Sequence, residues 1–197
     1  MKLFTIGYID HNRDVHNKYL QKSIDNLKGE FNVISTSDKE CPARNYNTMI
    51  SMCDTKYLIL VHQDITFTPN ILSDIHDTIR ELPVFGAIGY VGANSNGITY
   101  SEKDRIKVLD TIDACFIVLN MNNNLLFDDV VFNDYHLYVE DYCARLNKEG
   151  LPIITIKTDK DSISHHSSTC RELGWMWGRY KEYKQIFNNL HKGFKTT

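Results

Sequence analysis

The stretch that most constrains this chain is Lys56–Thr66, where a run of apolar residues ends abruptly in polar ones. Tyr57–Val61 is unbroken, has the length of a strand, and is followed at once by His62, Gln63 and Asp64. A continuous apolar run predicts a strand buried on both faces, as in a sheet covered by helices. Polar residues at its end reach the crevice beyond the carboxyl edge, where open α/β sheets bind ligands. We expect Asp64 to hold a divalent cation there, although the three residues could simply begin a loop and cap the next helix.

Strand and helix patterns alternate along most of the chain. We expect strands over residues 2–8, 31–35, 57–61, 84–91, 108–119 and 152–156, and helices over residues 14–27, 43–53, 69–82, 138–148 and 173–190. Residues 92–106 are predicted to form a flexible loop over the site, and residues 157–167 a polar loop. The alternation predicts a single α/β domain with a mixed, mostly parallel, Rossmann-like sheet, right-handed crossovers and helices on both faces.

Net charge and cysteine usage exclude several classes of protein. A formal net charge of −3 argues against a nucleic-acid coat or a polybasic membrane binder, although the tail from Cys170 to Thr197 has six basic and two acidic side chains. The five cysteines include no C-x-x-C pair, which excludes a zinc ribbon or a thioredoxin motif. Scattered thiols, an N-terminal apolar stretch too short for a signal peptide and no window of membrane-spanning length predict a cytoplasmic protein without a transmembrane segment.

Three short polar clusters stand at predicted strand ends or helix starts: His62-Gln63-Asp64, Glu140-Asp141 and His165-His166. Each cluster has a simple explanation, since acids in the first turn of a helix complement its dipole and paired histidines suit a solvated loop. Together they supply what metal-assisted group transfer requires: a carboxylate for the cation, an imidazole as second ligand, and a separate carboxylate as general base.

Other common chemistries lack their signatures in this sequence. There is no G-x-x-x-x-G-K-[ST] loop, no G-x-G-x-x-G after the first strand, no G-x-S-x-G elbow and no H-x-E…P-C-x-x-C deaminase motif. A sugar nucleotidyltransferase would need a glycine-rich, arginine-containing loop after the first strand, which residues 7–11 do not provide.

Several segments in order carry a family resemblance. They are Ala43–Asn47, Lys56–Ile65 with its HQD motif, Phe85–Gly89, Thr111–Phe116, Phe127-Asp128, Tyr138–Tyr142 with Arg145, and His165-His166. This series, which covers nearly the whole chain, resembles family 2-like glycosyltransferases of the GT-A fold, in the short bacterial and viral branch that carries HQD in place of D-x-D. The chain departs from the family at His62, which replaces the first acid of D-x-D, and at Ala114, which replaces a common glycine.

The resemblance implies a metal-dependent, inverting transfer of a sugar from a nucleotide-sugar, with UDP favoured, to an acceptor hydroxyl. Asp64 would bind Mn²⁺ or Mg²⁺, with His165 or His166 as a further ligand and His62 at the position of the first acid. Asp141, the second acid of the pair with Glu140, would be the catalytic base.

The resemblance also implies a division of the chain into a nucleotide-sugar-binding half (1–92), an acceptor and catalytic half (107–168) and a C-terminal helix (170–197). Asp113 would lie near the transferred sugar. The nucleotide would be held by Tyr8, Asp10, Ser35, Thr36, Asp38, Arg44, Asn45 and Gln63.

The acceptor is left open by the sequence, and the aromatic, basic C-terminal helix allows three interpretations. It could lie near a membrane face and serve a lipid-linked or surface saccharide, or contact DNA in a viral-type enzyme acting on a hydroxymethylated pyrimidine. It could instead pack its aromatic side chains onto the sheet. A further alternative, suggested by His62, is a degenerate module that only binds a nucleotide. The residues concerned are Arg171, Trp175, Trp177, Arg179, Tyr180, Lys181 and Phe187.

Overall fold

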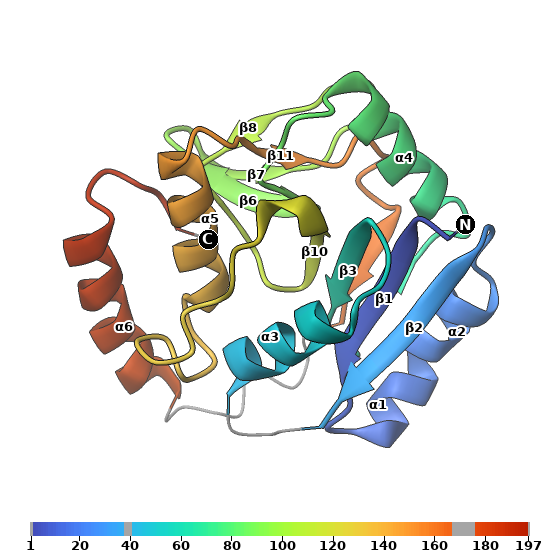
Figure 1. The fold of residues 1–197 in the computed structure, drawn as a ribbon, viewed down its shortest axis with the longest axis horizontal. Coiled ribbons are helices and arrows are strands. Elements are labelled where there is room, and N and C mark those ends of the chain that lie inside the picture. The colour runs from blue at the N-terminus through green and yellow to red at the C-terminus, as the bar shows by residue number, and fades with distance from the viewer. Residues whose placement is uncertain (1, 38–40, 167–175, 197) are drawn as a thin grey trace.

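The computed structural model describes residues 2–37, 41–166 and 176–196. Its central sheet has seven strands (Figure 1), five of which run in one direction while β10 and β8 run in the other. The mixed, mostly parallel sheet predicted from the sequence is therefore confirmed. In spatial order the strands are β2 (Phe31–Thr36), β1 (Phe4–Ile9), β3 (Tyr57–Val61), β10 (Phe116–Asn120), β5 (Ala87–Gly89), β11 (Ile153–Thr155) and β8 (Val108–Leu109).

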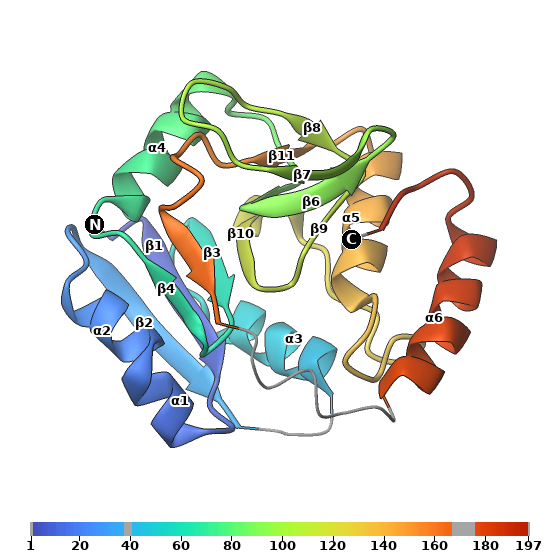
Figure 2. The same ribbon diagram turned by 180° about the vertical axis from the view of Figure 1, so that it is seen from behind.

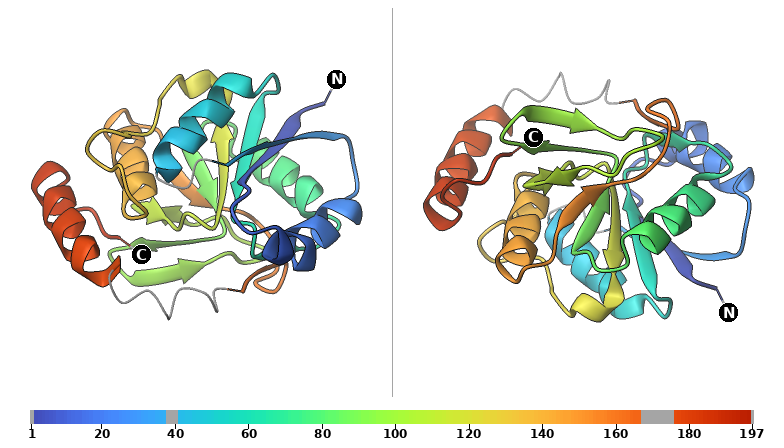
Figure 3. Two further views of the ribbon diagram at one scale, coloured as in Figure 1. Left: turned by 90° about the horizontal axis from the view of Figure 1, so that it is seen from below. Right: turned by 90° about the horizontal axis from the view of Figure 1, so that it is seen from above.

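Strand β3 is buried on both faces because its side chains alternate between two hydrophobic cores. Leu58 and Leu60 belong to one core, and Tyr57, Ile59 and Val61 belong to the other. The first core is closed by side chains from α3, α5 and α6, and the second by side chains from α2 and α4. Figure 3 shows these helices on the two sides of the sheet. Their bounds are α1 (Arg13–Lys18), α2 (Leu20–Asp25), α3 (Pro42–Met52), α4 (Ile71–Glu81), α5 (Tyr138–Lys148) and α6 (Met176–Leu190), with a 3₁₀ turn at Met121–Asn123.

Two smaller sheets complete the fold, and the sequence patterns missed both. One joins β4 (Ile65–Phe67) to β12 (Ile163–His165), the orange strand beside β4 in Figure 2. The other joins β7 (Gly97–Tyr100), β6 (Val91–Asn94) and β9 (Thr111–Ile112).

The flexible loop predicted over residues 92–106 is thus wrong for its first half, which is a hairpin. Asn94 pairs with Gly97 across a two-residue turn, and Gly97 has φ +101°, a conformation that glycine adopts without strain. Asparagine and glycine are frequent in and beside hairpin turns, a signal that the polar composition of this segment obscured. The strands predicted over residues 84–91 and 108–119 each break into shorter strands, and the polar loop predicted over 157–167 contains β12.

Two helix predictions also need correction. The helix expected over residues 14–27 is broken at Tyr19, where φ −118° and ψ −78° separate α1 from α2. Pro69 lies outside α4, which begins two residues later and is preceded by Asn70 at the N-cap.

Helix α5 matches its predicted bounds and ends as expected at Gly150. Gly150 has φ +76°, its amide donates to the Asn147 carbonyl (3.0 Å), and the Leu151 amide donates to the Leu146 carbonyl (3.0 Å). At the other end, the buried Leu137 occupies the N-cap with φ +63°, a conformation that costs a non-glycine residue on the order of 1–3 kcal/mol. Such strain is characteristic of functional regions.

Among the described helices, none combines the length and the apolar character that a membrane-crossing segment requires.

We predict that Gly92→Ala destabilises the fold, because a Cβ there would lie 2.2 Å from the Thr111 carbonyl oxygen on the neighbouring strand β9. The expected loss is about 1–3 kcal/mol in the free energy of unfolding, measured by urea denaturation. Ile98→Ala in the same small sheet is the matched control: this side chain is 64% exposed, and its removal should change stability by less than about 0.5 kcal/mol. Equal stability of Gly92→Ala and the wild type would contradict this close approach of β6 and β9.

Candidate metal and nucleotide site

Two histidines and one aspartate from distant parts of the chain meet beyond the end of β3. His62 and Asp64 follow β3 directly, and His165 is the last residue of β12. The β4–β12 register pairs His165 with Ile65, and the next amide, that of His166, donates to the Asp64 carbonyl (2.9 Å). As a result, ligand atoms of His62, Asp64 and His165 lie within 4.8 Å of one another, with His165 Nε2 3.3 Å from Asp64 Oδ1.

Burial and the contact between His165 and Asp64 set the ionisation of this cluster. Burial lowers the pKa of His62, and the charge of His165 lowers it further, so that His62 offers a neutral imidazole. Burial opposes ionisation of Asp64, but the hydrogen bond and charge of His165 outweigh it and hold the Asp64 pKa below its usual value. Burial works against a charged His165 as well, and the hydrogen bond and charge of Asp64 raise its pKa overall. The donor set of two imidazoles and one carboxylate fits a first-row divalent metal such as Mn²⁺ better than Mg²⁺, which prefers oxygen ligands.

A second group adjoins the first through His165. Asp113, Cys115 and His165 also place ligand atoms within 4.8 Å of one another. The Cys115 amide donates to Asp113 Oδ1 (2.8 Å), and burial together with the Asp113 charge raises the pKa of the Cys115 thiol well above its usual value. A protonated thiol is a poor ligand, so Asp113 is the useful group of this set.

His166 takes no part in either group. Its Nε2 lies 3.0 Å from Thr66 Oγ1, and its ring stacks on that of Tyr19 with the ring centres 4.3 Å apart. These contacts fit a role in anchoring the β4–β12 sheet.

The predicted nucleotide-binding residues on β1 and β2 do come together. The two strands are parallel and in register, so Tyr8 lies beside Ser35, and the Asp10 amide donates to the Thr36 carbonyl (2.7 Å). Asp10 is paired with Arg13 (3.0 Å), while the buried Thr36 hydroxyl has no hydrogen-bond partner among the residues that the structure describes. A buried orphan hydroxyl at this edge is a free group for a ligand. Asp38 lies outside the described residues.

Gln63, Asn45 and Arg44 have different surroundings. Gln63 is buried, and its Oε1 accepts hydrogen bonds from the amides of His11 (3.3 Å) and Asn12 (3.1 Å), which fastens the loop after β1 to the end of β3. The buried Asn45 donates to the Cys41 carbonyl (3.0 Å) at the start of α3, whereas Arg44 is exposed on that helix. Of the three, Arg44 is the most accessible to a ligand.

Asp141 is held from two sides. Its Oδ2 accepts from Arg145 Nε (2.8 Å) and its Oδ1 from His191 Nε2 (2.7 Å). Lys148 Nζ lies 2.8 Å from the other nitrogen of the same imidazole, and because an ammonium group only donates, this Nδ1 accepts and Nε2 carries the proton. No sequence pattern singled out His191, which lies 50 residues from its partner.

Tyr46 and Tyr138 form a buried pair whose rings meet edge to face at 5.5 Å, and the charge of Glu140 acts on Tyr138. Burial raises the pKa of Tyr138 well above its usual value, and the negative charges of Glu140 and Asp113 add to this effect. Burial likewise raises the pKa of Tyr46, with Asp113 again contributing, and Tyr46 donates to the Ala114 carbonyl (3.5 Å). The charges of Glu140 on α5 and of Asp113 beside the metal cluster therefore both act on Tyr138.

The described part of the C-terminal helix packs its aromatic side chains inward. Phe187 and Tyr183 are buried in the core shared with α5, and Tyr180 packs against it. Arg179 pairs with Asp134 (2.8 Å), and the Tyr183 hydroxyl donates to Asn133 (2.7 Å). Packing on the domain is thus confirmed for Tyr180 and Phe187. Arg171 and Trp175, and the side chain of Trp177, lie outside what the structure describes.

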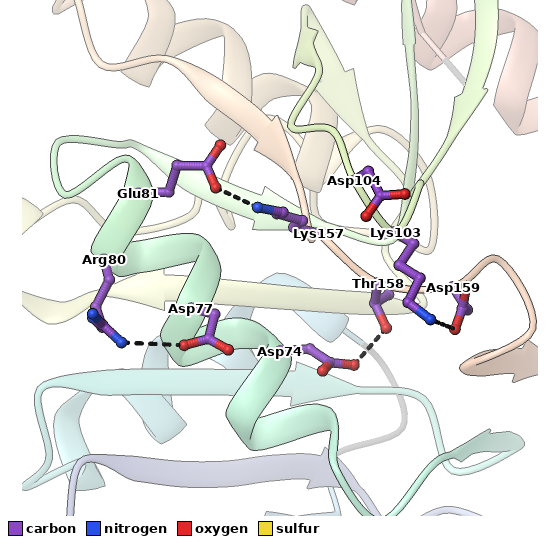
Figure 4. Close-up of a pocket in the computed structure, with 9 residues that line it drawn as sticks. All are labelled: Asp74, Asp77, Arg80, Glu81, Lys103, Asp104, Lys157, Thr158 and Asp159. Carbon is purple, nitrogen blue, oxygen red and sulfur yellow. Dashed lines mark hydrogen bonds and ion pairs between the residues drawn. The ribbon is translucent and has the colours of Figure 1, made fainter.

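A charged pocket of about 520 Å³ lies between the end of α4 and residues 103–104 and 157–159 (Figure 4). Its charged groups pair with one another: Lys157 with Glu81 (2.6 Å), Arg80 with Asp77 (3.6 Å) and Lys103 with Asp159 (3.6 Å). It includes none of the residues of the metal cluster.

Solved structures with a similar fold are glycosyltransferases. The S. aureus TarS 1-349 structure matches with a TM-score of 0.57 and 12% identity over 80% of this chain and 58% of that one. A Pyrobaculum calidifontis mannosyltransferase in complex with GDP-Man and Mn²⁺ matches with a TM-score of 0.66 and 10% identity over 98% of this chain and 65% of that one. GalNAc-T7 with UDP, GalNAc and Mn²⁺ matches with a TM-score of 0.63 and 6% identity over 84% of this chain and 44% of that one.

These comparisons establish the fold. At such identities the likeness confirms the GT-A-type α/β architecture, and this chain spans less than two thirds of the length of each relative. No protein-family model matches the sequence, and no curated protein sequence matches it.

We predict that Asp64→Asn and His165→Ala each weaken Mn²⁺ binding at least tenfold, about 1.4 kcal/mol, because each removes one of three clustered donors. Calorimetric titration with Mn²⁺ measures the change. His76→Ala is the matched control, since it removes an exposed imidazole on α4 that is not part of the cluster, and it should retain the wild-type affinity. Equal losses in all three variants would contradict the assignment.

We predict that Asp141→Asn lowers the free energy of unfolding by on the order of 3 kcal/mol, because it leaves Arg145 and His191 facing a neutral, buried group. Urea denaturation checks the change. Glu149→Gln, on the exposed end of the same helix, should leave stability within about 0.5 kcal/mol of the wild type. A stable Asp141→Asn protein would show that the contacts with Arg145 and His191 add little to stability.

Proposed function

We propose that this chain is a glycosyltransferase that moves a sugar from a nucleotide-sugar to an acceptor hydroxyl. The observation that carries the proposal is the meeting of His62, Asp64 and His165 at the carboxyl edge of β3, on a GT-A-type fold. Open α/β sheets bind ligands at this edge. The solved relatives bound to UDP-GlcNAc, or to GDP-Man with Mn²⁺, share this fold and support the same class of donor.

Residues of the first two strands are assigned to the nucleotide. Tyr8, Asp10 and Ser35 lie at the edge where the donor would sit, and the orphan hydroxyl of Thr36 is free to bond a polar group of the nucleotide. UDP remains the favoured carrier. Arg44, exposed in the first turn of α3, is placed to meet a phosphate, which the helix N-terminus also favours.

His62, Asp64 and His165 would hold the divalent metal, for which Mn²⁺ is the better fit. A bound cation supplies charge neutralisation for the diphosphate leaving group. Asp113, next to His165, is assigned to the transferred sugar, where its carboxylate can accept hydrogen bonds from sugar hydroxyls.

For the catalytic base we favour Glu140 over Asp141. Asp141 is 2% exposed and each of its oxygens already accepts a hydrogen bond, from Arg145 and from His191, which disfavours it as the group that takes a proton from an acceptor. Glu140 precedes it in the first turn of α5, and its charge acts on Tyr138, as does that of Asp113. A carboxylate in this place takes the acceptor proton as the hydroxyl attacks, and a single displacement of this kind inverts the anomeric centre. Asp141 then positions the first turn of α5.

We predict that Glu140→Gln lowers sugar transfer by about 10²–10⁴-fold while leaving Mn²⁺-dependent UDP binding unchanged, since the variant removes the base and not the donor site. Release of nucleotide from a panel of UDP- and GDP-sugars, with Mn²⁺ and a mixture of saccharide acceptors, measures the rate. Glu149→Gln at the far end of the same helix is the control and should keep full activity.

Two results would count against these assignments. If Glu140→Gln is as active as the wild type while a folded Asp141→Asn is inactive, the base is Asp141. If the wild type binds UDP with Mn²⁺ but turns over none of the donors, the chain is a nucleotide-binding module and the transferase proposal fails.

A further inference from the structure

A second pocket, of about 630 Å³, lies between the β6–β7 hairpin and the loop that leads into β12. Its volume is within the range of small-ligand sites. It is distinct from the metal cluster, which contributes none of its lining residues. Those residues are Tyr90, Ile98, Thr99, Tyr100, Ser101, Glu102, Lys103, Lys107, Asp159, Lys160 and Asp161.

Two short stretches of the chain join the pocket to the metal cluster. Tyr90, which lines it, precedes Val91, and the Val91 carbonyl accepts from the Asp113 amide (2.9 Å). Asp161, on its other wall, lies four residues before His165, so the two Cα atoms are at most roughly 14 Å apart. A chain molecule that reached the cluster with one end could therefore rest in this pocket with a more distant part.

The pocket walls are held in place by hydrogen bonds that do not use the exposed rings. The Tyr90 hydroxyl donates to the Lys160 carbonyl (2.7 Å), which joins the two walls. Ser101 fixes the end of β7, since its amide (2.8 Å) and its hydroxyl (2.9 Å) both donate to the Tyr90 carbonyl. These hydrogen bonds therefore hold the Tyr90 and Ser101 segments of the pocket in place without a ligand.

Exposed aromatic and apolar side chains stand among the charged residues of the pocket. Tyr100 is 52% exposed and Ile98 64%, and the rings of Tyr90 and Tyr100 meet edge to face with their centres 6.1 Å apart. Large apolar side chains left open in a concave site favour a ligand with an apolar face. A sugar ring offers such a face, with hydroxyl groups around its edge for the charged side chains nearby.

The charge of the pocket is balanced, with three lysines and three carboxylates among its lining residues. Two of the lysines are already paired, Lys107 with Glu102 (2.5 Å) and Lys103 with Asp159 (3.6 Å). A groove that binds nucleic acid requires a basic surface that displaces the counterions of the phosphates. This pocket has no net basic surface of that kind. The balanced charge and the exposed aromatic ring together favour an uncharged saccharide as the ligand.

We propose that this pocket binds the saccharide chain of the acceptor, at a distance from the hydroxyl that reacts. The inference rests on the proposed function, since it assigns an acceptor to that same reaction. Tyr100 is the main contact, because it is the more exposed ring of the pair and stands on the hairpin edge.

The test uses the full chain on an array of neutral and acidic oligosaccharides that also carries single-stranded DNA. The wild type is expected to bind neutral oligosaccharides, Tyr100→Ala to lose at least tenfold in apparent affinity, and Tyr100→Phe to retain it because the ring remains. Tyr135→Ala, which removes another exposed tyrosine (41%) outside the pocket, is the matched control and should bind like the wild type. Calorimetry with UDP and Mn²⁺ is run in parallel on all four proteins.

The two measurements separate failure of this inference from failure of the proposed function. The inference is overturned if the wild type binds UDP with Mn²⁺ but no oligosaccharide, if Tyr100→Ala binds saccharide as well as the wild type, or if DNA is the ligand that depends on Tyr100. If UDP is not bound but saccharide capture still depends on Tyr100, the saccharide site stands and the transferase assignment fails.

Discussion

The pairing of β4 with β12 is the interaction on which the candidate site depends. It is a two-stranded sheet of only three residues a side, and it brings His165 beside Asp64 across a hundred residues of chain. A shift by one residue would turn the His165 side chain to the opposite face and remove a donor from the cluster. The neighbouring His166 stabilises this register, because its amide bonds the Asp64 carbonyl while its ring packs on Tyr19 and contacts Thr66.

A second set of contacts orders the other side of the site. The C-terminal segment returns to α5, where His191 and Arg145 occupy both oxygens of Asp141. Further along, the Thr111 hydroxyl donates to the Lys195 carbonyl (2.7 Å), so the tail also holds β9, next to Asp113. The strained Leu137 immediately before α5 is kept in place by its burial in the same core. These contacts give the basic, aromatic tail a structural use that its composition alone did not reveal.

Local patterns predicted the elements that carry strong periodicity and clear ends. Tyr57–Val61 and Tyr138–Lys148 have the bounds read from the sequence, because one is an unbroken apolar run and the other has an apolar stripe closed by Gly150. The short strands β7 and β12 and most of β6 were missed, since they contain polar residues or glycine and gain their conformation from their partner strands. β9 was not separated from the strand predicted over residues 108–119. Tyr19 breaks α1 from α2 although an apolar helical pattern continues through it, so periodicity over-extended that helix.

The sequence by itself determined the α/β class, the buried central strand and the polar residues at its end, because these follow from hydrophobic pattern and from the direction of parallel strands. It also singled out His62, Asp64 and His165 as metal-type donors. Only the tertiary structure decided that these three meet, that His166 does not join them, and that Asp141 is occupied by Arg145 and His191. Strand register and the return of the tail set those contacts, and both depend on packing between residues that lie far apart in the chain.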